Sequence, residues 1–317
     1  MDSYNNFIGI DIGKFNFVAT EHDNKLIKEY KNTGSGVNQF LKDFKKVLPK
    51  ALCILEPTGG YEMMLLFSLC NKGYAVHRAH APHVKNFIRS YGTHAKTDRI
   101  DARMLSKYGY ERAKSLDKYT PPEETTLQLY ELTQRRRDLK QMLVAEKNRL
   151  KSPRMQLVRS SLEAHIEMLE SEMDKITAQI NVMMLENKTY KEKKKIIKTI
   201  PGIGDITANE LLILLPELGQ ISRREIAALV GLAPISNESG RYKGYRRTGH
   251  GRDGIKPALF LAAMAARNSK SHLKEFYEDL IKRGKSKMVA LTALMRKIIV
   301  IANAKLRDYM IKESTTT

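Results

Sequence analysis

Short apolar runs with the period of β-strands alternate with helix-like segments up to about residue 90. Bounded by polar and glycine-containing turns, these runs predict five strands, at 7–13, 15–20, 25–30, 51–55 and 74–78. Helical spacing predicts a helix at 37–47, one after the fourth strand and one after Pro82. The run 51–55 is apolar at every position, which is typical of a central strand covered on both faces. This order of elements predicts an α/β sheet domain whose first strands are antiparallel.

From about residue 124 the pattern becomes that of long amphipathic helices. Leucine, isoleucine and methionine recur at heptad-like spacing among many charges, and Pro153 divides the stretch in two. Packing of one helix face on a core would explain this row of apolar residues. The length of the segment, however, favours a helical hairpin or coiled coil that contacts another protein molecule. The last part of the chain is predicted to be mostly α-helical, with a helix at 206–215, a basic glycine-rich hairpin within 231–254 and two or three final helices.

Charge follows the same division into three predicted domains, at 1–120, 121–190 and 191–317. Their net charges are +7, zero and +13, which give +20 for the whole chain. Such a surplus attracts polyanions, and nucleic acid is the commonest polyanion in a cytosol. The alternative is a device for solubility or a protein that works beside the ribosome.

Composition excludes several other classes of protein. Hydrophobic residues are 42% of the chain and charged residues 28%, as in ordinary folded proteins. No apolar run approaches the roughly 18 residues that cross a bilayer, and the N-terminus lacks a signal-peptide pattern. Two cysteines, Cys53 and Cys70, are too few for a disulfide scaffold or a cysteine zinc cluster. We therefore expect a cytoplasmic protein with no membrane partner.

Four acidic residues stand where a metal site would need them. Asp11 lies near the end of the first predicted strand, and Glu56 follows the apolar strand 51–55. Asp98 and Asp101 are three residues apart, so a helix would place them on one face. Carboxylates at the ends of adjacent central strands, facing a helix that carries two more, can hold two Mg²⁺ ions for phosphodiester displacement.

Each of these acids alone has an ordinary structural explanation. Asp11 would cap a turn, Glu56 would end a strand, and the other two would pair with Arg99 and Arg103. However, clustered carboxylates repel one another, so a fold tolerates them only with a metal or with basic partners. The four acids together favour the metal site.

Three segments around the acids resemble the motifs of the DEDD transposases: Ile-Gly-Ile-Asp-Ile-Gly-Lys at 8–14, Leu-Glu-Pro-Thr-Gly-Gly-Tyr at 55–61 and Lys-Thr-Asp-Arg-Ile-Asp-Ala-Arg at 96–103. These are insertion-sequence recombinases whose N-terminal domain is similar to the Holliday-junction resolvase RuvC. The resemblance implies a ribonuclease-H-like fold for 1–120, with Mg²⁺ held by the acids Asp11, Glu56, Asp98 and Asp101. We also expect three neighbouring cations to contact nucleic acid: Lys96, Arg99 and Arg103.

The glycine-rich stretch carries the second set of candidate residues. Positions 241–256 hold six basic residues against one acid, and we expect five of these cations to bind backbone phosphate: Arg241, Lys243, Arg246, Arg247 and Arg252. Ser239, next to Gly240, lies where the backbone can approach phosphate closely. A serine among arginines is a candidate nucleophile, although chemistry alone favours a structural turn serine, because no general base is adjacent in sequence.

The same stretch resembles the C-terminal domain of the DEDD transposases, in which the serine before glycine is the nucleophile. That position is Ser239. Ser236 is the competing candidate, but it is not followed by glycine. The resemblance implies a covalent phosphoserine link to DNA, and a composite site in which one subunit gives the acids and another the serine, within a dimer or tetramer. As in the bridge-RNA-guided recombinases of the insertion-sequence 110 family, it also implies a structured non-coding RNA as partner.

Pro-Gly-Ile-Gly at 201–204 predicts a helix-hairpin-helix turn. Gly202 and Gly204 would expose backbone N–H groups to a phosphate at the start of the next helix. A tight interhelical turn without a ligand explains the motif equally well.

The sequence thus predicts an insertion-sequence transposase that cuts and rejoins DNA with a Mg²⁺-dependent acidic site and a serine nucleophile, guided by a bridge RNA. Two alternatives stay open. One is a metal-only nuclease similar to a junction resolvase, in which Ser239 is structural. The other is a non-catalytic nucleic-acid-binding protein that keeps the fold.

Overall fold

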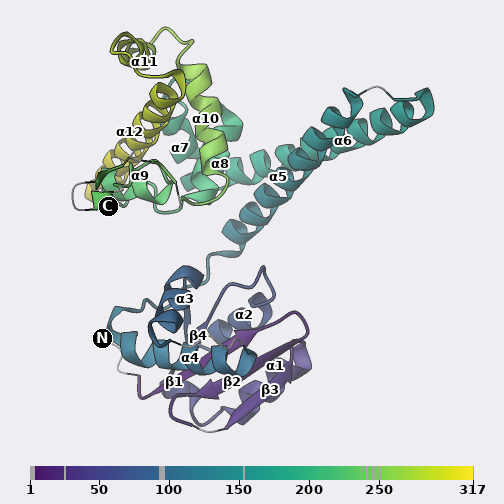
Figure 1. The fold of residues 1–317 in the computed structure, drawn as a ribbon, viewed down its shortest axis with the longest axis vertical. Coiled ribbons are helices and arrows are strands. Elements are labelled where there is room, and N and C mark those ends of the chain that lie inside the picture. The colour runs from purple at the N-terminus through teal and green to yellow at the C-terminus, as the bar shows by residue number, and fades with distance from the viewer. Residues whose placement is uncertain are drawn as a thin grey trace. The chain divides into compact units, whose positions relative to one another are not determined.

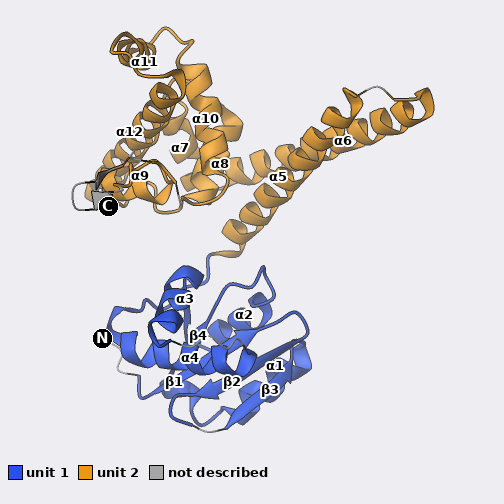
Figure 2. Ribbon diagram, viewed as in Figure 1, with its two compact units in different colours: residues 1–122 blue, residues 123–317 orange. Residues whose placement is uncertain are grey.

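The computed structural model describes residues 4–24, 26–92, 97–152, 154–236, 238–239, 242–244, 247–249 and 251–316. The chain divides into two compact units, 1–122 and 123–317 (Figures 1 and 2). A further border near residue 190, inside the second unit, stays a prediction.

The first unit is built on a five-stranded sheet (Figure 1). Its strands are β1 (Asn6–Ile12), β2 (Asn16–Glu21), β3 (Ile27–Lys31), β4 (Ala51–Leu55) and β5 (Ala75–Arg78). They lie in the order β3-β2-β1-β4-β5; the β3-β2-β1 part is antiparallel, and β1-β4-β5 is parallel. This mixed sheet has the strand order of a ribonuclease-H-like fold, so the predicted fold of the N-terminal domain is confirmed.

Helices cover both faces of this sheet. They are α1 (Gly34–Asp43), α2 (Met63–Asn71), α3 (Ala81–Ser90) and α4 (Asp98–Arg112), with short 3₁₀ turns η1 (Leu48–Lys50) and η2 (Ala113–Ser115). Side chains alternate along a strand, so β1 packs Ile8 and Ile10 against α1 and α2, and Phe7 against α3 and α4. All five residues of β4 are buried, which explains why this strand has no polar position.

The second unit is mostly helical. Its helices are α5 (Glu124–Leu150), α6 (Gln156–Glu186), α7 (Lys188–Ile197), α8 (Asp205–Leu214), α9 (Arg223–Leu229), α10 (Ile255–Ala266), α11 (His272–Lys282) and α12 (Lys287–Thr316). α5 and α6 form the predicted helical hairpin, which packs through Leu139, Leu143 and Leu169. None of the helices in the described part of the chain is long and apolar enough to cross a membrane.

The rest of the second unit packs around one large core. Leu211 of α8, Leu259 of α10 and Ile298 of α12 are buried at its centre. Between α9 and α10 lies a pair of short antiparallel strands, β6 (Glu238–Ser239) and β7 (Tyr242–Lys243). The mostly helical C-terminal region with a hairpin in its glycine-rich stretch is therefore as predicted.

Candidate active site

Asp11 and Glu56 occupy equivalent places on two neighbouring parallel strands. β1 and β4 pair with Ile10 opposite Leu55, and the next residue on each strand is one of the two acids. Asp11 is the penultimate residue of β1, and Glu56 directly follows β4. Both are half-buried. The sheet therefore brings these two predicted site residues side by side at the carboxyl ends of its central strands.

Helix α4 covers the face of the sheet toward which Asp11 points. Gly9 lies against the backbone of Ala102, so closely that a Cβ on Gly9 would overlap the Ala102 carbonyl oxygen. Further along the helix, Gly109 packs near Phe7, with its Cβ position 3.3 Å from the Phe7 ring. Because Phe7, Gly9 and Asp11 share one face of β1, the helix runs antiparallel to the strand. Its first turn therefore lies toward the end of β1 that carries Asp11.

Asp98 and Asp101 belong to that first turn of α4. Thr97 is the N-cap, and its side chain accepts a hydrogen bond from the Ile100 N–H. Asp98 is exposed, and Asp101 is half-buried. The positive end of the helix macrodipole stabilises both carboxylates, which is a structural reason for acids here. The antiparallel packing nevertheless brings them to the same corner of the unit as the acids of the sheet.

The donor set at this corner suits a hard divalent cation, because carboxylate oxygens are the ligands that Mg²⁺ prefers. Within the described ranges, however, no three His, Cys, Asp or Glu side chains are grouped closely enough to hold a metal ion. The fold thus brings the four acids to one corner of the first unit without gathering them into a ready ligand group.

A fifth acid, Glu62, shapes the loop that leaves β4 after Glu56, and the sequence analysis missed it. Its side chain is completely buried. One carboxylate oxygen accepts hydrogen bonds from the N–H groups of Thr58 (2.9 Å) and Gly60 (3.0 Å) and from the Thr58 hydroxyl (3.3 Å). The other oxygen binds the Arg78 guanidinium at 2.7 Å. Glu62 therefore fixes the path of the residues that follow Glu56.

The environment of Glu62 favours its charged form. Burial by itself raises the pKa of this carboxyl, but the hydrogen bonds from Arg78 and Thr58 outweigh burial and hold its pKa below the ordinary value. The only signal in the sequence is a second acid behind a Thr-Gly-Gly turn. Gly59 and Gly60 adopt φ values of 69° and 102°, which let the turn bring its N–H groups to the carboxylate.

The proposed nucleophile lies in the hairpin of the second unit. Ser239 in β6 pairs with Tyr242 in β7, and Glu238 pairs with Lys243. The structure describes the backbone of this pair but not the side chains of Ser239 and Lys243. Three of the predicted nucleic-acid contacts lie outside the described residues: Lys96, Arg241 and Arg246. Arg247 is exposed, and its backbone forms a β-bridge with Ile235. On α4, the side chains of Arg99 and Arg103 are also exposed.

Two close contacts hold the base of the glycine-rich stretch together. Gly231, with φ of 67°, packs against the backbone of Gly251. The Arg252 guanidinium binds both carboxylate oxygens of Glu217, at 2.6 and 2.8 Å, and the Leu214 carbonyl at 2.8 Å. Arg252 therefore anchors the stretch in this conformation, and its predicted contact with phosphate would require it to leave Glu217.

The turn between α7 and α8 contains the two glycines predicted to bind phosphate. Gly202 has φ of 91°, and a Cβ there would overlap the backbone of Ala262 in α10. Packing thus explains this glycine without a ligand. Gly204 is exposed and is the N-cap of α8. Binding of phosphate by either glycine stays a prediction.

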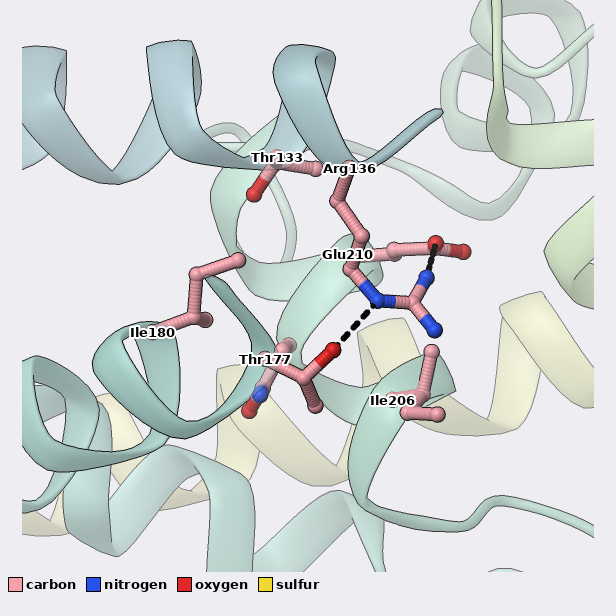
Figure 3. Close-up of a pocket in the computed structure, with 7 residues that line it drawn as sticks. Thr133, Arg136, Thr177, Ile180, Ile206 and Glu210 are labelled. Atoms are coloured by element: carbon pink, nitrogen blue, oxygen red, sulfur yellow. Dashed lines mark hydrogen bonds and ion pairs between the residues drawn. The ribbon is translucent and has the colours of Figure 1, made fainter. Parts of the chain in front are cut away.

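A second buried ion pair lies where α5, α6 and α8 meet (Figure 3). Arg136 donates to the Thr177 hydroxyl at 2.8 Å and to Glu210 at 3.3 Å. The adjoining cavity is small, about 10 Å³. Among the described atoms, Thr133 Oγ1 and Asn209 Oδ1 are buried there without a hydrogen-bond partner. Burial raises the pKa of Glu210 even though Arg136 opposes the shift. This cluster joins the helical hairpin to the C-terminal core.

The fold and the acidic corner define the class of the protein. A ribonuclease-H-like sheet, with acids at the ends of its central parallel strands and on the helix packed over them, is the arrangement of an enzyme that cuts polynucleotides. Two family profiles match the chain, one described as "Transposase", for the DEDD transposases of IS110, over residues 8–157, and one described as "Transposase IS116/IS110/IS902 family" over 194–278. The chain belongs to the IS110 family of transposases, and it is therefore an enzyme that acts on DNA.

Two distant relatives extend over most of the chain. Pilin gene-inverting proteins of Moraxella lacunata and Moraxella bovis are each 24% identical to it, over 95% of this chain and 96% of the relative. An uncharacterized 43.6 kDa protein of the insertion element IS110 from Streptomyces coelicolor is 28% identical over 50% of this chain and 39% of that protein. The resemblance inferred from the motifs is thereby confirmed.

Proposed function

We propose that this enzyme cuts and rejoins DNA with a Mg²⁺-dependent site formed by Asp11, Glu56, Asp98 and Asp101. The observation that carries the proposal is the convergence of two strand ends and the first turn of α4 on one corner of the first unit. Divalent cations bound there would stabilise the charge on the attacking and leaving oxygens of a phosphodiester. In this proposal the four carboxylates bind the cations, and Glu62 positions Glu56 through the loop that joins them.

Ser239 is the proposed nucleophile. Its Oγ attacks phosphorus and gives up its proton, a phosphoserine ester forms, and the leaving sugar oxygen takes up a proton. The reverse reaction with another DNA end releases the serine and rejoins the strand. Basic residues of the same stretch, Arg247 among them, hold the backbone phosphates. The support for this part is the match of 194–278 to the C-terminal family profile.

Two partners complete the proposal. A structured bridge RNA selects the DNA, which rests on the family resemblance alone. A homodimer or tetramer supplies the acids and the serine of one composite site from different subunits, and the α5–α6 hairpin is the proposed contact between subunits.

Recombination between two DNA sites, with the flanking non-coding RNA supplied, tests the proposal. The wild-type protein should recombine the sites and leave a covalent protein–DNA product on a denaturing gel. Asp11→Asn and Glu56→Gln should abolish recombination. Ser239→Ala should abolish both recombination and the covalent product. Asp23→Asn and Ser236→Ala are matched controls, because each removes the same group at a position outside the proposed site.

The outcomes separate the alternatives. Recombination by Ser239→Ala, together with its loss in Asp11→Asn, would replace the serine mechanism by a metal-only nuclease. Full activity of Asp11→Asn and Glu56→Gln would overturn the acidic site. Undiminished recombination without RNA would remove the guide from the proposal.

DNA inversion is a second candidate outcome of the same chemistry. Its support is the name of the two Moraxella relatives, which align with 95% of this chain. A plasmid that carries the two sites in inverted orientation would yield an inverted segment, whereas directly repeated sites would yield a deletion. A protein that recombines only the inverted arrangement is an invertase.

A further inference from the structure

A basic groove lies on the second unit, and none of the residues that line it belongs to the proposed chemistry. Residues of helices α9, α11 and α12 form it, and its volume is about 530 Å³. Seven residues line it: Arg223, Arg224, Phe276, Ala293, Arg296, Lys297 and Val300. Four of the seven are cations, and no acid is among them.

The four cations do not serve ion pairs within the described part of the chain. Three acids on α9 and α11 have other partners. Glu225 caps α9 through Ser222, and Asp279 pairs with Arg283 at 2.8 Å. Glu278 lies 3.7 Å from Lys274. Four cations gathered in one groove repel one another, so this arrangement is stabilised when a polyanion occupies it.

The local structure of α9 does not explain why two of these residues are cations. Arg223 and Arg224 are the first two residues of α9, where the positive end of the helix macrodipole disfavours a cation. Both are exposed. On the opposite wall, Lys297 lies over the Phe276 ring, with its Nζ 3.9 Å from the ring centroid. This contact holds the ammonium group at the groove instead of leaving it free to turn into solvent.

We propose that this groove binds the phosphate backbone of duplex DNA. The inference rests on the action of this family on DNA and extends it to residues outside the motifs named in the sequence analysis. Because contacts with phosphates carry no sequence information, the groove would position DNA without selecting its sequence. Each phosphate neutralised by a cation contributes about 0.9 to the slope of log K against log salt concentration.

Binding of the full-length protein to duplex DNA of two unrelated sequences, in EDTA and over a series of salt concentrations, tests this proposal. Arg296→Gln/Lys297→Gln should reduce the salt slope by about 2 and weaken binding about tenfold or more at low salt, equally for both sequences. Arg223→Gln/Arg224→Gln, at exposed positions, should have a similar effect, and it keeps the test valid if the first variant is unstable.

The control is Lys270→Gln/Lys285→Gln, which removes the same charge from exposed positions outside the groove. A loss of affinity in the control equal to that in the groove variants would overturn the proposal, because net charge alone would explain it. A loss confined to duplex RNA of the same sequence would overturn the assignment to DNA. Since Asp11→Asn should abolish recombination but not this binding, failure of the groove and failure of the acidic site give different results.

Discussion

Among the described residues of each compact unit, a glutamate with little exposed surface pairs with an arginine, Glu62 in the first and Glu210 in the second, and the two pairs differ in what surrounds them. Glu62 in the first unit accepts three hydrogen bonds from its own loop besides its contact with Arg78. Glu210 in the second unit has Arg136 at 3.3 Å, beside buried polar atoms that lack partners among the described residues. The pKa of Glu62 is lowered and that of Glu210 is raised.

The difference shows that burial alone does not decide whether the pKa of a carboxyl group is raised or lowered. Desolvation is the largest influence on both groups, and it raises the pKa of each. The hydrogen bond from Arg78 and those from the loop N–H groups reverse its effect on Glu62, because these donors are fixed and point at the charge. A loop next to a proposed active site is thus held by a buried charge that accepts several hydrogen bonds, whereas the helix junction is held by one that is poorly compensated.

The largest expected effect is that of Glu210→Ala on stability. Removing the carboxylate leaves Arg136 buried without its counterion, which should lower the free energy of unfolding of the second unit by about 3–5 kcal/mol. Hydrogen exchange of α5, α6 and α8 in the full chain measures it. The control Arg136→Met/Glu210→Leu should be close to wild type, because apolar pairs replace buried ion pairs well. An equally unstable double variant would show that shape, not charge, holds the junction.

Glu62→Ala should have a smaller effect on stability and a clear one on activity. Thr58 and Gly60 lose their acceptor, while the partly exposed Arg78 returns to water, so the expected loss is about 2–3 kcal/mol. Displacement of Glu56 should slow recombination about ten- to a hundredfold and raise the Mg²⁺ concentration needed for half-maximal rate.

Glu62→Gln keeps an oxygen that accepts from the loop, so it should restore part of the rate at high Mg²⁺. A Mg²⁺ dependence identical to that of the wild type in both Glu62 variants would leave this residue with a structural role only.

The pH dependence of stability should have opposite signs for the two pairs. A lowered pKa means that the contribution of Glu62 is complete above its ordinary pKa of 4.5 and is lost as pH falls below it. A raised pKa means that the native state binds a proton at Glu210 more tightly, so its contribution declines as pH rises above 4.5. Unfolding of wild type, Glu62→Gln and Glu210→Gln between about pH 4 and 7 measures both differences. Differences that change in the same direction would contradict the comparison.

The smallest expected effect concerns the threonine beside each pair. Thr58→Val removes a hydrogen bond to Glu62 and should cost about 0.5–1.5 kcal/mol. Thr133→Val removes a hydroxyl that is buried without a partner among the described atoms, so it should be neutral or slightly stabilising. Thermal unfolding of the two variants compares them. A clear loss in Thr133→Val would indicate a bound water in the small cavity between α5 and α8.

Much of the architecture could be predicted because it depends on local periodicity. Each of the five predicted strands lies within a few residues of the observed one. Helix α5 ends at Leu150 and α6 begins at Gln156, on either side of the predicted break, whose Pro153 lies outside the described residues. Asp11 and Glu56 could be recognised because each marks the end of an apolar run, and parallel neighbours place such ends together. Glu62 was missed because an acid behind a turn looks like any exposed loop residue until the fold buries it.

The sequence by itself determined the order of elements, the position of each acid on its strand or helix, and the family to which the chain belongs. Tertiary structure alone decided that Arg78 neutralises Glu62, that Glu217 engages Arg252, and that α9 and α12 share one basic groove. The physical reason is the separation along the sequence of the residues that each interaction joins. Hydrophobic spacing is set by neighbours within a few residues, whereas burial and ion pairing depend on side chains that packing brings together from distant parts of the chain.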